Sequence, residues 1–423
     1  MGILGARSRA RLLRACSAGQ PLAVVGITHS QSCLILRGRL RALRDAGFSV
    51  VLISSPGEMA EQLASDEGAN LISIPIQRGI SPLADIVSLF RLTWALGHLR
   101  PSIAEFSTPK AGLLGSLAAF LCRVPSRVYL LRGLRLETSS GLKRAVLKAS
   151  EKLAAACAHT VVCNSESLRR QTIDLRLAPG SKLKVLGGGS SNGVDIVKFT
   201  PGPDTMRAKL GIPAGAPVVG FVGRLTRDKG IPELLEAFNR LLEKMPDTRL
   251  LLVGWFDESE DALSVYQRAR IEAHPRIIRT GFVANTAPYY RAMDLLVLPT
   301  WREGFPNAVL EAAAAGLPVI TTQTTGARDA VLPGLTGVLV PPGEPLALAE
   351  ALLSLLQHPE RRLSMGATAR QWVVQEFGNR RVLGLTVNLY LQLLRQADTR
   401  NRRRAPEPAL LRQLAKDAVA SGD

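Results

Sequence analysis

Two short segments contain residue types that suit the chemistry of phosphorylated sugars. Residues 302–312 read R-E-G-F-P-N-A-V-L-E-A and place Glu303 and Glu311 eight residues apart among mostly apolar neighbours. A second segment, G-R-L-T-R-D-K-G, contains Arg224 and Lys229. Cations neutralise phosphate charge, whereas carboxylates accept hydrogen bonds from sugar or ribose hydroxyls. If the fold brings both segments together, they suit a diphosphate attached to polyhydroxyl groups, as in a nucleotide sugar.

The elements that must position these residues are short apolar strands alternating with amphipathic helices. The predicted strands of the first half are residues 22–27, 49–53, 71–74, 103–106, 127–131 and 160–163, with helical patterns between them, for example at 34–46 and 142–156. Those of the second half are 218–222, 250–253, 277–279, 295–298, 319–322 and 337–340. After Pro345 the pattern is helical to about residue 396. Strands separated by helices indicate βαβ units and parallel sheets.

The length of 423 residues exceeds the size at which one hydrophobic core stops growing. Turn-rich stretches at 187–193 and 199–204 separate the two series of strands, and we place the domain boundary there. We therefore predict an α/β protein with two doubly wound domains and a disordered charged segment at 400–404. The predicted parts are a basic arm (1–20), a first domain (21–200), a second domain (201–380) and a C-terminal helix with a charged tail (381–423).

The second domain should bring the chemical residues to one edge of its sheet. In open α/β sheets, ligands bind in the crevice outside the carboxyl ends of the strands. Arg224, Glu303 and Gly326 each follow one of the predicted strands, so all three should face one crevice. Lys229 precedes a helix that we expect to begin at Pro232.

A helix start should separate the two glutamates. Pro306 suits the first helical position, and the unpaired N–H groups of Asn307 and Ala308 would then point into the same crevice. Glu303 lies before this helix, whereas Glu311 lies more than one turn inside it. Each glutamate also has an ordinary structural interpretation, Glu303 as an acidic residue near a helix start and Glu311 as the buried partner of an arginine.

Other chemistries leave no signature in the sequence. There is no Asp-x-Asp pair, and the five histidines are scattered, so we expect neither a metal site nor a cofactor. A G-x-S-x-G elbow and a G-x-x-x-x-G-K-[ST] phosphate loop are also absent. The run Gly187-Gly188-Gly189 precedes Asn192-Gly193 rather than a helix start, so we interpret it as a junction turn and not as a dinucleotide loop.

The charge differs between the two halves. Residues 1–200 contain 26 Lys and Arg against 12 Asp and Glu, a net charge of +14, whereas residues 201–423 contain 27 against 23, a net charge of +4. A basic first half suits an anionic partner such as a membrane surface, a phosphorylated substrate or nucleic acid. A solvated Arg-rich surface is the simpler alternative.

The sequence also bears on cellular location. No apolar run reaches the roughly 18 residues that a membrane-spanning helix needs. The basic N-terminus lacks the apolar block of a signal peptide and the Ser or Thr of a myristoylation site. The five cysteines follow neither a disulfide nor a metal-binding pattern, which favours the cytosol.

These segments resemble glycosyltransferase family 4, whose members are retaining enzymes of GT-B architecture. The matching segments are F-V-G-R-L-T-R-D-K-G-I-P-E-L-L-E-A-F, L-L-L-V-G, G-F-V, A-M-D-L-L-V-L-P-T-W-R-E-G-F-P-N-A-V-L-E-A-A-A-A-G-L-P-V-I and, at the junction, N-G-V-D-I-V-K-F. Together they cover most of residues 185–345. The resemblance implies two Rossmann-like domains that face a central cleft, with C-terminal helices returning toward the first domain.

The resemblance implies a role for each residue on the donor side. Arg224 and Lys229 would bind the donor diphosphate and stabilise the departing nucleotide, so that no metal is needed. Glu303 would contact the donor sugar near the reacting centre, and Glu311 would hold the ribose hydroxyls. Glu303, Arg224 and Lys229 are therefore the expected catalytic residues. The other expected donor-binding residues are Gly223, Gly304, Phe305, Asn307, Ala308 and Gly326.

The first half resembles the acceptor domain of bacterial hexosaminyltransferases that act on polyprenyl-diphosphate-linked glycans. The similar segments are S-T-P-K-A-G-L-L-G, L-R-G-L-R-L-E and the run from V-V-C-N-S-E-S-L to L-G-G-G-S-S-N-G-V-D. Two departures concern the site: Ser107 stands where many members have histidine, and residues 28–32 read T-H-S-Q-S where many have a Gly-Gly turn. The acceptor-side candidates are Ser30, Thr108, Lys110 and Arg132.

The implied activity is transfer of a sugar from a UDP-sugar to a lipid-linked saccharide in cell-surface polysaccharide or glycoconjugate synthesis. The sugar would be an N-acetylhexosamine or a hexose. The alternatives are transfer to a small soluble acceptor and a nucleotide-sugar 2-epimerase of the same architecture. We expect no nucleic-acid partner, because the aromatic residues, 5% of the chain, do not cluster with the basic ones.

We also expect a cytoplasmic protein that is peripheral on the inner face of the cytoplasmic membrane. In the predicted helix 34–46, Leu36, Leu40 and Leu43 would face the core, while Arg37, Arg41 and Arg44 would form a cationic stripe on another face. Such a stripe would attract anionic headgroups and the diphosphate of a lipid carrier. A solvated basic face is again the alternative.

Overall fold

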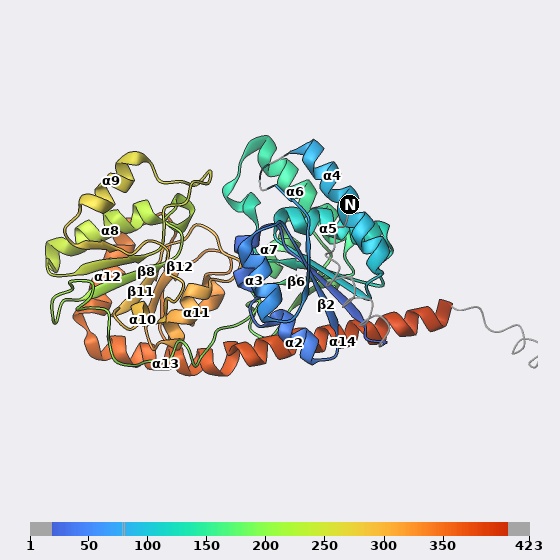
Figure 1. Cartoon of the computed structure of the whole chain (residues 1–423). Helices are drawn as coiled ribbons and strands as arrows, with labels where there is room; N and C mark the ends of the chain where they lie inside the picture. Colours follow the sequence, from blue (N-terminus) through green and yellow to red (C-terminus); the bar gives the residue numbers. More distant parts are fainter. Residues whose placement is uncertain (1–18, 78, 80, 405–423) are drawn as a thin grey trace, which may run out of the picture.

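The computed structural model describes residues 19–77, 79 and 81–404, which form two α/β domains and a long C-terminal helix pair (Figure 1). Each domain is built around one parallel sheet whose strands alternate with helices. The predicted fold class of two doubly wound domains is therefore confirmed. The basic arm lies outside the described residues except for its last two positions, and so does the tail beyond residue 404.

The first sheet has seven parallel strands in the order β3-β2-β1-β4-β5-β6-β7. All six strands predicted for this half are present, and β7, with the sequence L-K-V, is additional because three residues carry no visible pattern. The strands are β1 (Leu22–Gly26), β2 (Ser49–Ser54), β3 (Asn70–Ser73), β4 (Ile103–Ser107), β5 (Ser126–Leu131), β6 (Thr160–Cys163) and β7 (Leu183–Val185).

Helices cover both faces of this sheet because its strands are apolar on both sides. Along β1, Ala23 and Val25 pack with α2, α3 and the C-terminal helix α14, whereas Val24 packs with α4 and α5 on the opposite face. The helices of this domain are η1 (Ser30–Leu36), α2 (Arg39–Asp45), α3 (Glu58–Asp66), α4 (Pro82–Leu99), α5 (Pro109–Leu121), η2 (Arg135–Thr138), α6 (Gly141–Cys157), α7 (Glu166–Asp174) and η3 (Gly180–Lys182).

The prediction of a single helix at 34–46 is wrong in one respect. The chain forms the 3-10 helix η1 and the α-helix α2, separated at Gly38, whose φ of +79° lies in the left-handed region that favours glycine. The expected amphipathic character is nevertheless present. The buried leucines are Leu36, Leu40 and Leu43, and the exposed arginines are Arg37, Arg41 and Arg44.

The second sheet has six parallel strands in the order β10-β9-β8-β11-β12-β13, and all six were predicted. Its strands are β8 (Val218–Val222), β9 (Arg249–Val253), β10 (Ile277–Arg279), β11 (Leu295–Leu298), β12 (Val319–Thr322) and β13 (Gly337–Val340). Its helices are η4 (Arg227–Lys229), α8 (Ile231–Lys244), α9 (Val265–Ala273), α10 (Ala287–Tyr290), α11 (Asn307–Ala314), η5 (Arg328–Ala330), α12 (Pro345–Gln357) and α13 (Pro359–Phe377).

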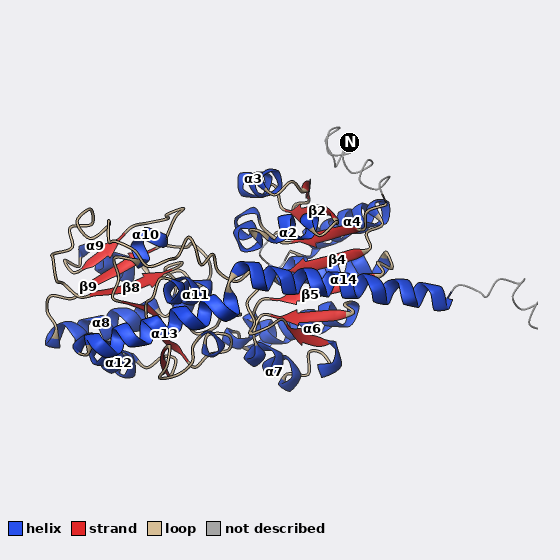
Figure 2. Cartoon of the chain, turned by 90° about the horizontal axis from the view of Figure 1, so that it is seen from below, coloured by secondary structure: helices blue, strands red, loops and turns tan. Residues whose placement is uncertain are grey.

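The last two helices connect the domains. Helix α13 packs on α11 of the second domain, and α14 (Asn379–Arg404) continues beneath the first domain (Figures 1 and 2). There the ring of Tyr390 meets Phe48 edge to face at 5.8 Å between centroids. The segment 400–404, expected to be disordered, is instead helical, because α14 extends to Arg404. Within the described ranges, no helix is both long and apolar enough to span a bilayer.

Candidate active site

Three loops meet closely where the domains face each other. They follow β5, β11 and β12 and contain Gly133, Gly304 and Gly326 respectively. A Cβ atom added to Gly304 would lie 1.6 Å from the carbonyl oxygen of Arg132, and one added to Gly326 would lie 2.4 Å from the carbonyl oxygen of Gly304. Such distances leave no space for a side chain, so glycine is what allows these backbones to approach. The strand ends therefore converge as the crevice rule predicted.

Two of the three expected catalytic residues, Lys229 and Glu303, form an ion pair in this crevice. The ammonium group of Lys229 donates to Oε1 of Glu303 across 74 residues of sequence, and both side chains are largely buried. Lys229 ends η4, directly before α8, whereas Glu303 lies in the loop between β11 and α11. Two residues that the sequence placed after different strands, Lys229 before a helix and Glu303 at a strand end, are therefore in direct contact.

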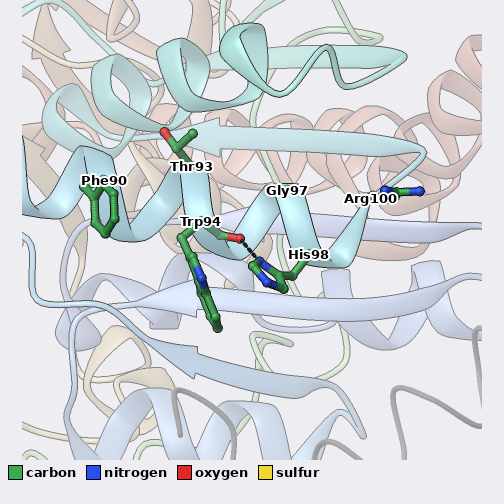
Figure 3. A pocket seen from close by; sticks show the side chains of 6 residues that line it. All are labelled: Phe90, Thr93, Trp94, Gly97, His98 and Arg100. Carbon is green, nitrogen blue, oxygen red and sulfur yellow. Dashed lines mark hydrogen bonds between the residues drawn. The ribbon is translucent and has the colours of Figure 1, made fainter. Parts of the chain in front are cut away.

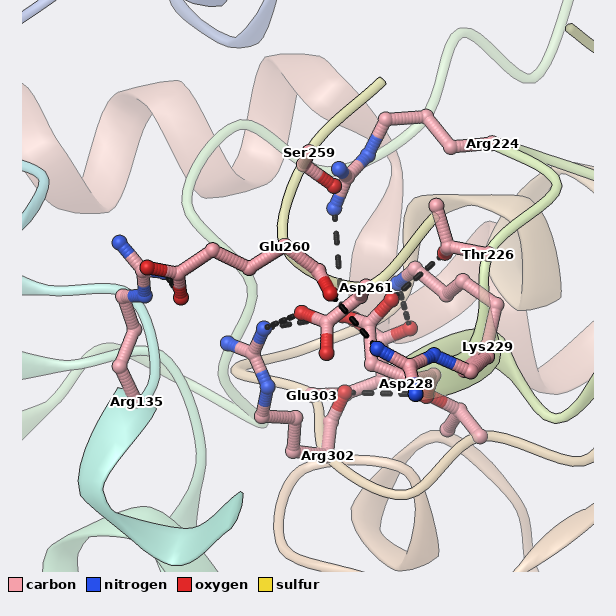
Figure 4. A network of polar contacts seen from close by, with 12 residues as sticks. Arg135, Arg224, Thr226, Asp228, Lys229, Ser259, Glu260, Asp261, Arg302 and Glu303 are labelled. Carbon is pink, nitrogen blue, oxygen red and sulfur yellow. Dashed lines mark hydrogen bonds and ion pairs between the residues drawn. The ribbon is translucent and has the colours of Figure 1, made fainter. Parts of the chain in front are cut away.

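Arg224 lies beside this pair in a wider charged network (Figure 4). Its Nη1 donates to Oδ2 of Asp257 at 3.0 Å, and its Nη2 lies 4.0 Å from Asp228. Asp228 also accepts from Arg302 at 2.9 Å and from the Thr226 hydroxyl at 2.6 Å. Burial alone would raise the pKa of Asp228, but the Thr226 hydroxyl and the neighbouring cations lower it below its usual value.

Glu311 lies inside α11 and is bonded to hydroxyl groups. The Tyr290 hydroxyl donates to Glu311 Oε2 at 2.9 Å, and the Thr286 hydroxyl lies 3.4 Å from the same oxygen. Removal from water raises the pKa of Glu311 to about 7, although the Tyr290 hydroxyl and Lys198 oppose the shift. The structure thus gives Glu311 tyrosine and threonine as partners, and not the arginine of the ordinary interpretation.

The start of α11 differs slightly from the prediction. Pro306 is the N-cap and Asn307 the first helical residue, so Pro306 precedes the helix rather than opening it. Phe305 is 7% exposed, and its ring packs against Phe377 at 5.2 Å between centroids. Gly223 has a φ of +151° and bonds through its N–H to Val253. The carbonyl oxygen of Ala308 accepts from the Tyr290 hydroxyl at 3.3 Å.

On the acceptor side, Arg132 is the candidate that reaches the other domain. Its carbonyl oxygen touches the Gly304 loop, and its Nη1 donates to the Ser191 hydroxyl at 2.6 Å. Its Nε and Nη2 are buried and have no hydrogen-bond partner among the described residues. Burial and the nearby Arg39 guanidinium lower the pKa of Arg132 to about 9.

The other acceptor-side candidates are engaged within their own domain. The Ser30 hydroxyl accepts from the N–H of Ala60 at 2.9 Å, at the start of α3. Lys110 pairs with Asp85 of α4, with a second contact at 2.7 Å.

Thr108 has a φ of +68° and shares a 2.6 Å hydrogen bond with the Thr28 hydroxyl at the end of β1. Ser107, where many family members have histidine, is fully buried, and its hydroxyl has no partner among the described residues.

Sequence reasoning missed an acidic loop after β9, which reads D-E-S-E-D from Asp257 to Asp261. Asp257 holds Arg224, and Asp261 lies 3.3 Å from Arg302. Glu260 reaches the first domain, at 2.5 Å from Lys143 and 3.5 Å from Arg135. The same crevice rule that selected Arg224 would have found this loop, because it also follows a predicted strand.

A second group of missed contacts joins the domains near Gly326. The Ser167 hydroxyl accepts from the Gly326 N–H at 2.8 Å and donates to Asp329. Thr325 donates to Glu137 at 2.7 Å.

In the part of the chain that the structure describes, no cluster of three or more His, Cys, Asp or Glu residues is arranged to hold a metal ion.

Solved structures with this architecture align over nearly the whole chain. Anabaena HepE in complex with UDP-glucose superimposes with a TM-score of 0.72, covering 88% of this chain and 99% of HepE at 20% identity. Sucrose-phosphate synthase from Thermosynechococcus elongatus superimposes with a TM-score of 0.73, covering 89% of this chain and all of the synthase at 22% identity. The fold is that of the GT-B glycosyltransferases.

Sequence similarity then identifies the family. Residues 216–358 match the family described as "Glycosyl transferases group 1", and residues 36–189 match "Glycosyl transferase 4-like domain". The capsular polysaccharide biosynthesis glycosyltransferase CapM of Staphylococcus aureus is 35% identical over 373 residues, covering 88% of this chain and 97% of CapM. The chain belongs to this family of two-domain glycosyltransferases, and it is a transferase enzyme.

Proposed function

We propose that this enzyme transfers an N-acetylhexosamine or a hexose from a UDP-sugar to a lipid-linked saccharide, with retention of anomeric configuration. The observation that carries the proposal is the convergence of Lys229, Glu303 and Arg224 on one crevice, next to the Arg132 loop of the other domain. A donor bound by the second domain would there present its sugar to an acceptor held by the first.

Arg224 and Lys229 would neutralise the donor diphosphate as the bond to the sugar breaks. Both are paired with carboxylates in the structure, Lys229 with Glu303 and Arg224 with Asp257. A diphosphate would take over these cations, and Asp228 would keep Arg302 at 2.9 Å as its own partner. Because side-chain cations supply the charge that the leaving group needs, we expect transfer without a metal ion.

The two glutamates would contact two parts of the donor. Glu303, freed from Lys229, would accept hydrogen bonds from the donor sugar near the reacting centre. Glu311 lies just over one turn into the helix that starts directly after this loop, and would accept from the ribose hydroxyls. The choice of UDP is supported by the HepE structures, which are described as complexes with UDP and with UDP-glucose.

The acceptor proposal depends on the first domain and on CapM. The first 200 residues have a net charge of +14, and the name of CapM refers to capsular polysaccharide biosynthesis. A lipid carrier would place the enzyme on the inner face of the cytoplasmic membrane. Arg132, whose buried Nε and Nη2 have no partner among the described residues, would donate to an anionic part of the acceptor.

A small soluble acceptor is the second candidate. Several relatives are called D-inositol 3-phosphate glycosyltransferase, for example that of Corynebacterium urealyticum, which is 36% identical over 42% of this chain. That match spans 45% of the relative's own length, so it bears on one half of the molecule only.

The test is a panel of UDP- and GDP-sugars incubated with the enzyme and either a membrane lipid extract or soluble sugar phosphates. We expect label from one UDP-sugar to enter the lipid fraction, equally with and without EDTA. Transfer to soluble acceptors alone would favour the second candidate. Full activity in each of Glu303→Gln, Glu311→Gln and Arg224→Ala would show that the site is elsewhere, and NMR of the product bond would test retention.

A further inference from the structure

Helix α4 exposes an apolar stripe to solvent. Leu83, Ile86, Phe90 and Trp94 recur at helical spacing and are 81%, 64%, 70% and 44% exposed, and Val87 lies beside them at 49%. Figure 3 shows Phe90 and Trp94 projecting from the same side of α4, and the His98 ring packs against Trp94 in a tilted arrangement at 4.1 Å between ring centroids. Exposed apolar patches of this kind mark interaction sites, whereas single exposed residues are common.

The neighbouring helices extend this apolar surface. Helix α5 packs between α4 and α6 on the same face of the first sheet (Figure 1). Its C-terminal end exposes Phe120 by 50% and Leu121 by 55%. On α6 the exposed apolar residues are Leu142, Val146 and Leu153.

The charge of this face is positive, because its carboxylates are already engaged. The three helices α4, α5 and α6 contain two acidic residues. Asp85 pairs with Lys110, and Glu151 is buried and accepts from the Tyr129 hydroxyl at 2.6 Å. The same helices also contain Arg91, Arg144, Lys148 and Lys152, and Lys143, which pairs with Glu260 of the other domain.

The apolar stripe begins at the cleft. Helices that follow parallel strands start at the carboxyl edge of the sheet, where the active-site crevice lies. Leu83 is in the first turn of α4, and Lys143, in the first turn of α6, contacts Glu260 of the other domain. From there α4 runs outward over 18 residues, or about 27 Å.

We infer that the α4–α6 face docks on an anionic lipid bilayer and thereby directs the active-site cleft toward a lipid-borne acceptor. The inference rests on the proposed lipid-linked acceptor. Apolar side chains would enter the headgroup boundary while the surrounding cations meet anionic headgroups. A second copy of the chain is a poorer occupant, because a symmetric contact would bring two basic faces together.

This surface differs from the basic stripe that the sequence suggested. The basic stripe of Arg37, Arg41 and Arg44 lies at α2, on the opposite face of the sheet. The exposed large apolar residue of η1 and α2 is Leu34, at 38%. That surface has charge with little apolar area. The α4–α6 face combines both, which is what interfacial binding requires.

Flotation of the full-length protein on phosphatidylglycerol-containing liposomes, against liposomes of phosphatidylcholine alone, tests the inference. We expect Phe90→Ser/Trp94→Ser to lower the partition coefficient about tenfold or more, since two large apolar side chains no longer enter the lipid. The matched control Val265→Ser/Tyr266→Ser removes two exposed apolar residues of α9 in the other domain and should float like the wild type. Arg144→Glu/Lys152→Glu should weaken binding mainly at low salt.

Several outcomes would overturn the inference. They are failure of the wild type to float on anionic liposomes, unchanged flotation of the Phe90→Ser/Trp94→Ser variant, or loss of flotation only in Arg37→Glu/Arg41→Glu/Arg44→Glu. If the wild type dimerises but does not bind lipid, and the Phe90→Ser/Trp94→Ser variant no longer dimerises, the face binds a second copy of the chain instead.

Transfer to a water-soluble, short-chain prenyl-diphosphate saccharide separates this inference from the proposed function. The α4 variant should retain that transfer and lose transfer to liposome-borne acceptor. If the wild type floats but transfers to neither acceptor, the proposed acceptor class is wrong while the docking surface stands.

Discussion

Each domain contains a tyrosine that donates to a glutamate, and the pair is buried in the first domain and part-buried in the second. In the first domain the Tyr129 hydroxyl donates to Glu151 at 2.6 Å, and in the second the Tyr290 hydroxyl donates to Glu311 at 2.9 Å. Burial raises the pKa of both glutamates to about 7 and raises both tyrosine pKa values well above their ordinary value. By local chemistry alone the two pairs are nearly equivalent.

Their positions relative to the cleft are not equivalent. Glu151 is 7% exposed in the second half of α6 and packs toward the core of the first domain. Glu311 lies in a short helix whose first residue follows the Glu303 loop. A perturbed pKa therefore does not by itself mark a functional site. Placement at the carboxyl ends of the strands separates the two, and the predictions below test that distinction.

The largest expected difference is between Arg224 and Arg227, two arginines on the loop after β8. Arg224 lies in the crevice beside Asp257, whereas Arg227 is exposed and donates to the backbone of Glu260 at 2.7 Å. We expect Arg224→Ala to lower kcat about 10²–10³-fold, because it removes charge stabilisation of the leaving group. Arg227→Ala should change kcat by less than about threefold. Equal losses in steady-state kinetics would contradict the assignment.

The second prediction concerns the pH dependence of stability, in which the two pairs should behave alike. The pKa of each glutamate is raised from an ordinary 4.5 to about 7 in the folded protein, so the folded state holds the proton more tightly than the unfolded state. This stabilisation is fully present at pH values below 4.5. That stabilisation is lost as pH rises toward 7, with a total loss on the order of 3 kcal/mol for each group. Glu151→Gln and Glu311→Gln should each become more stable relative to wild type between pH 5 and 8.

Urea unfolding at each pH measures this change, and the wild-type free energy of unfolding is the reference at every point. A difference between variant and wild type that stays constant from pH 5 to 8 would show that the glutamate titrates normally.

The third expected effect separates the pairs again. If Glu311 accepts from the ribose hydroxyls, Glu311→Gln should weaken binding of a UDP-sugar about tenfold, since a hydrogen bond to a charged group is lost. Glu151→Gln is the matched control and should leave affinity unchanged. Because bound hydroxyls favour the ionised carboxylate, wild-type affinity should rise between pH 6 and 7 and then level off. Calorimetry with a UDP-sugar measures both effects, and a pH-independent wild-type affinity would contradict the ribose assignment.

Much of the fold was predictable because its signals are local. Most strands are short, largely apolar runs, and their alternation with helices implies parallel sheets. The errors occurred where a single glycine or a long-range contact overrides the local pattern. Gly38 divides η1 from α2, although the apolar periodicity continues through it. The helix α14 includes the basic segment 400–404 because its earlier turns are packed on the first domain.

The site was predictable only where strand ends could be located. Arg224, Lys229 and Glu303 follow from the rule that ligands bind at carboxyl ends of strands, and two of them are in contact. The partners from the opposite domain were not predictable. Contacts such as Ser167 with Asp329 depend on how the two domains face each other, and no local pattern encodes that orientation.

The smallest expected effect is at Glu260, which joins the acidic loop to the first domain. Its side chain is 66% exposed, and its partners Lys143 and Arg135 are 45% and 39% exposed. Such exposed ion pairs contribute roughly 0.2–1 kcal/mol, and salt screens them. Glu260→Gln should therefore lower the free energy of unfolding by less than about 1 kcal/mol at low salt, with no difference at about 1 M salt. A larger, salt-independent loss would mean that this contact fixes the relative placement of the domains, and that the acidic loop contributes to the structure of the cleft as well as to the pairing of Arg224.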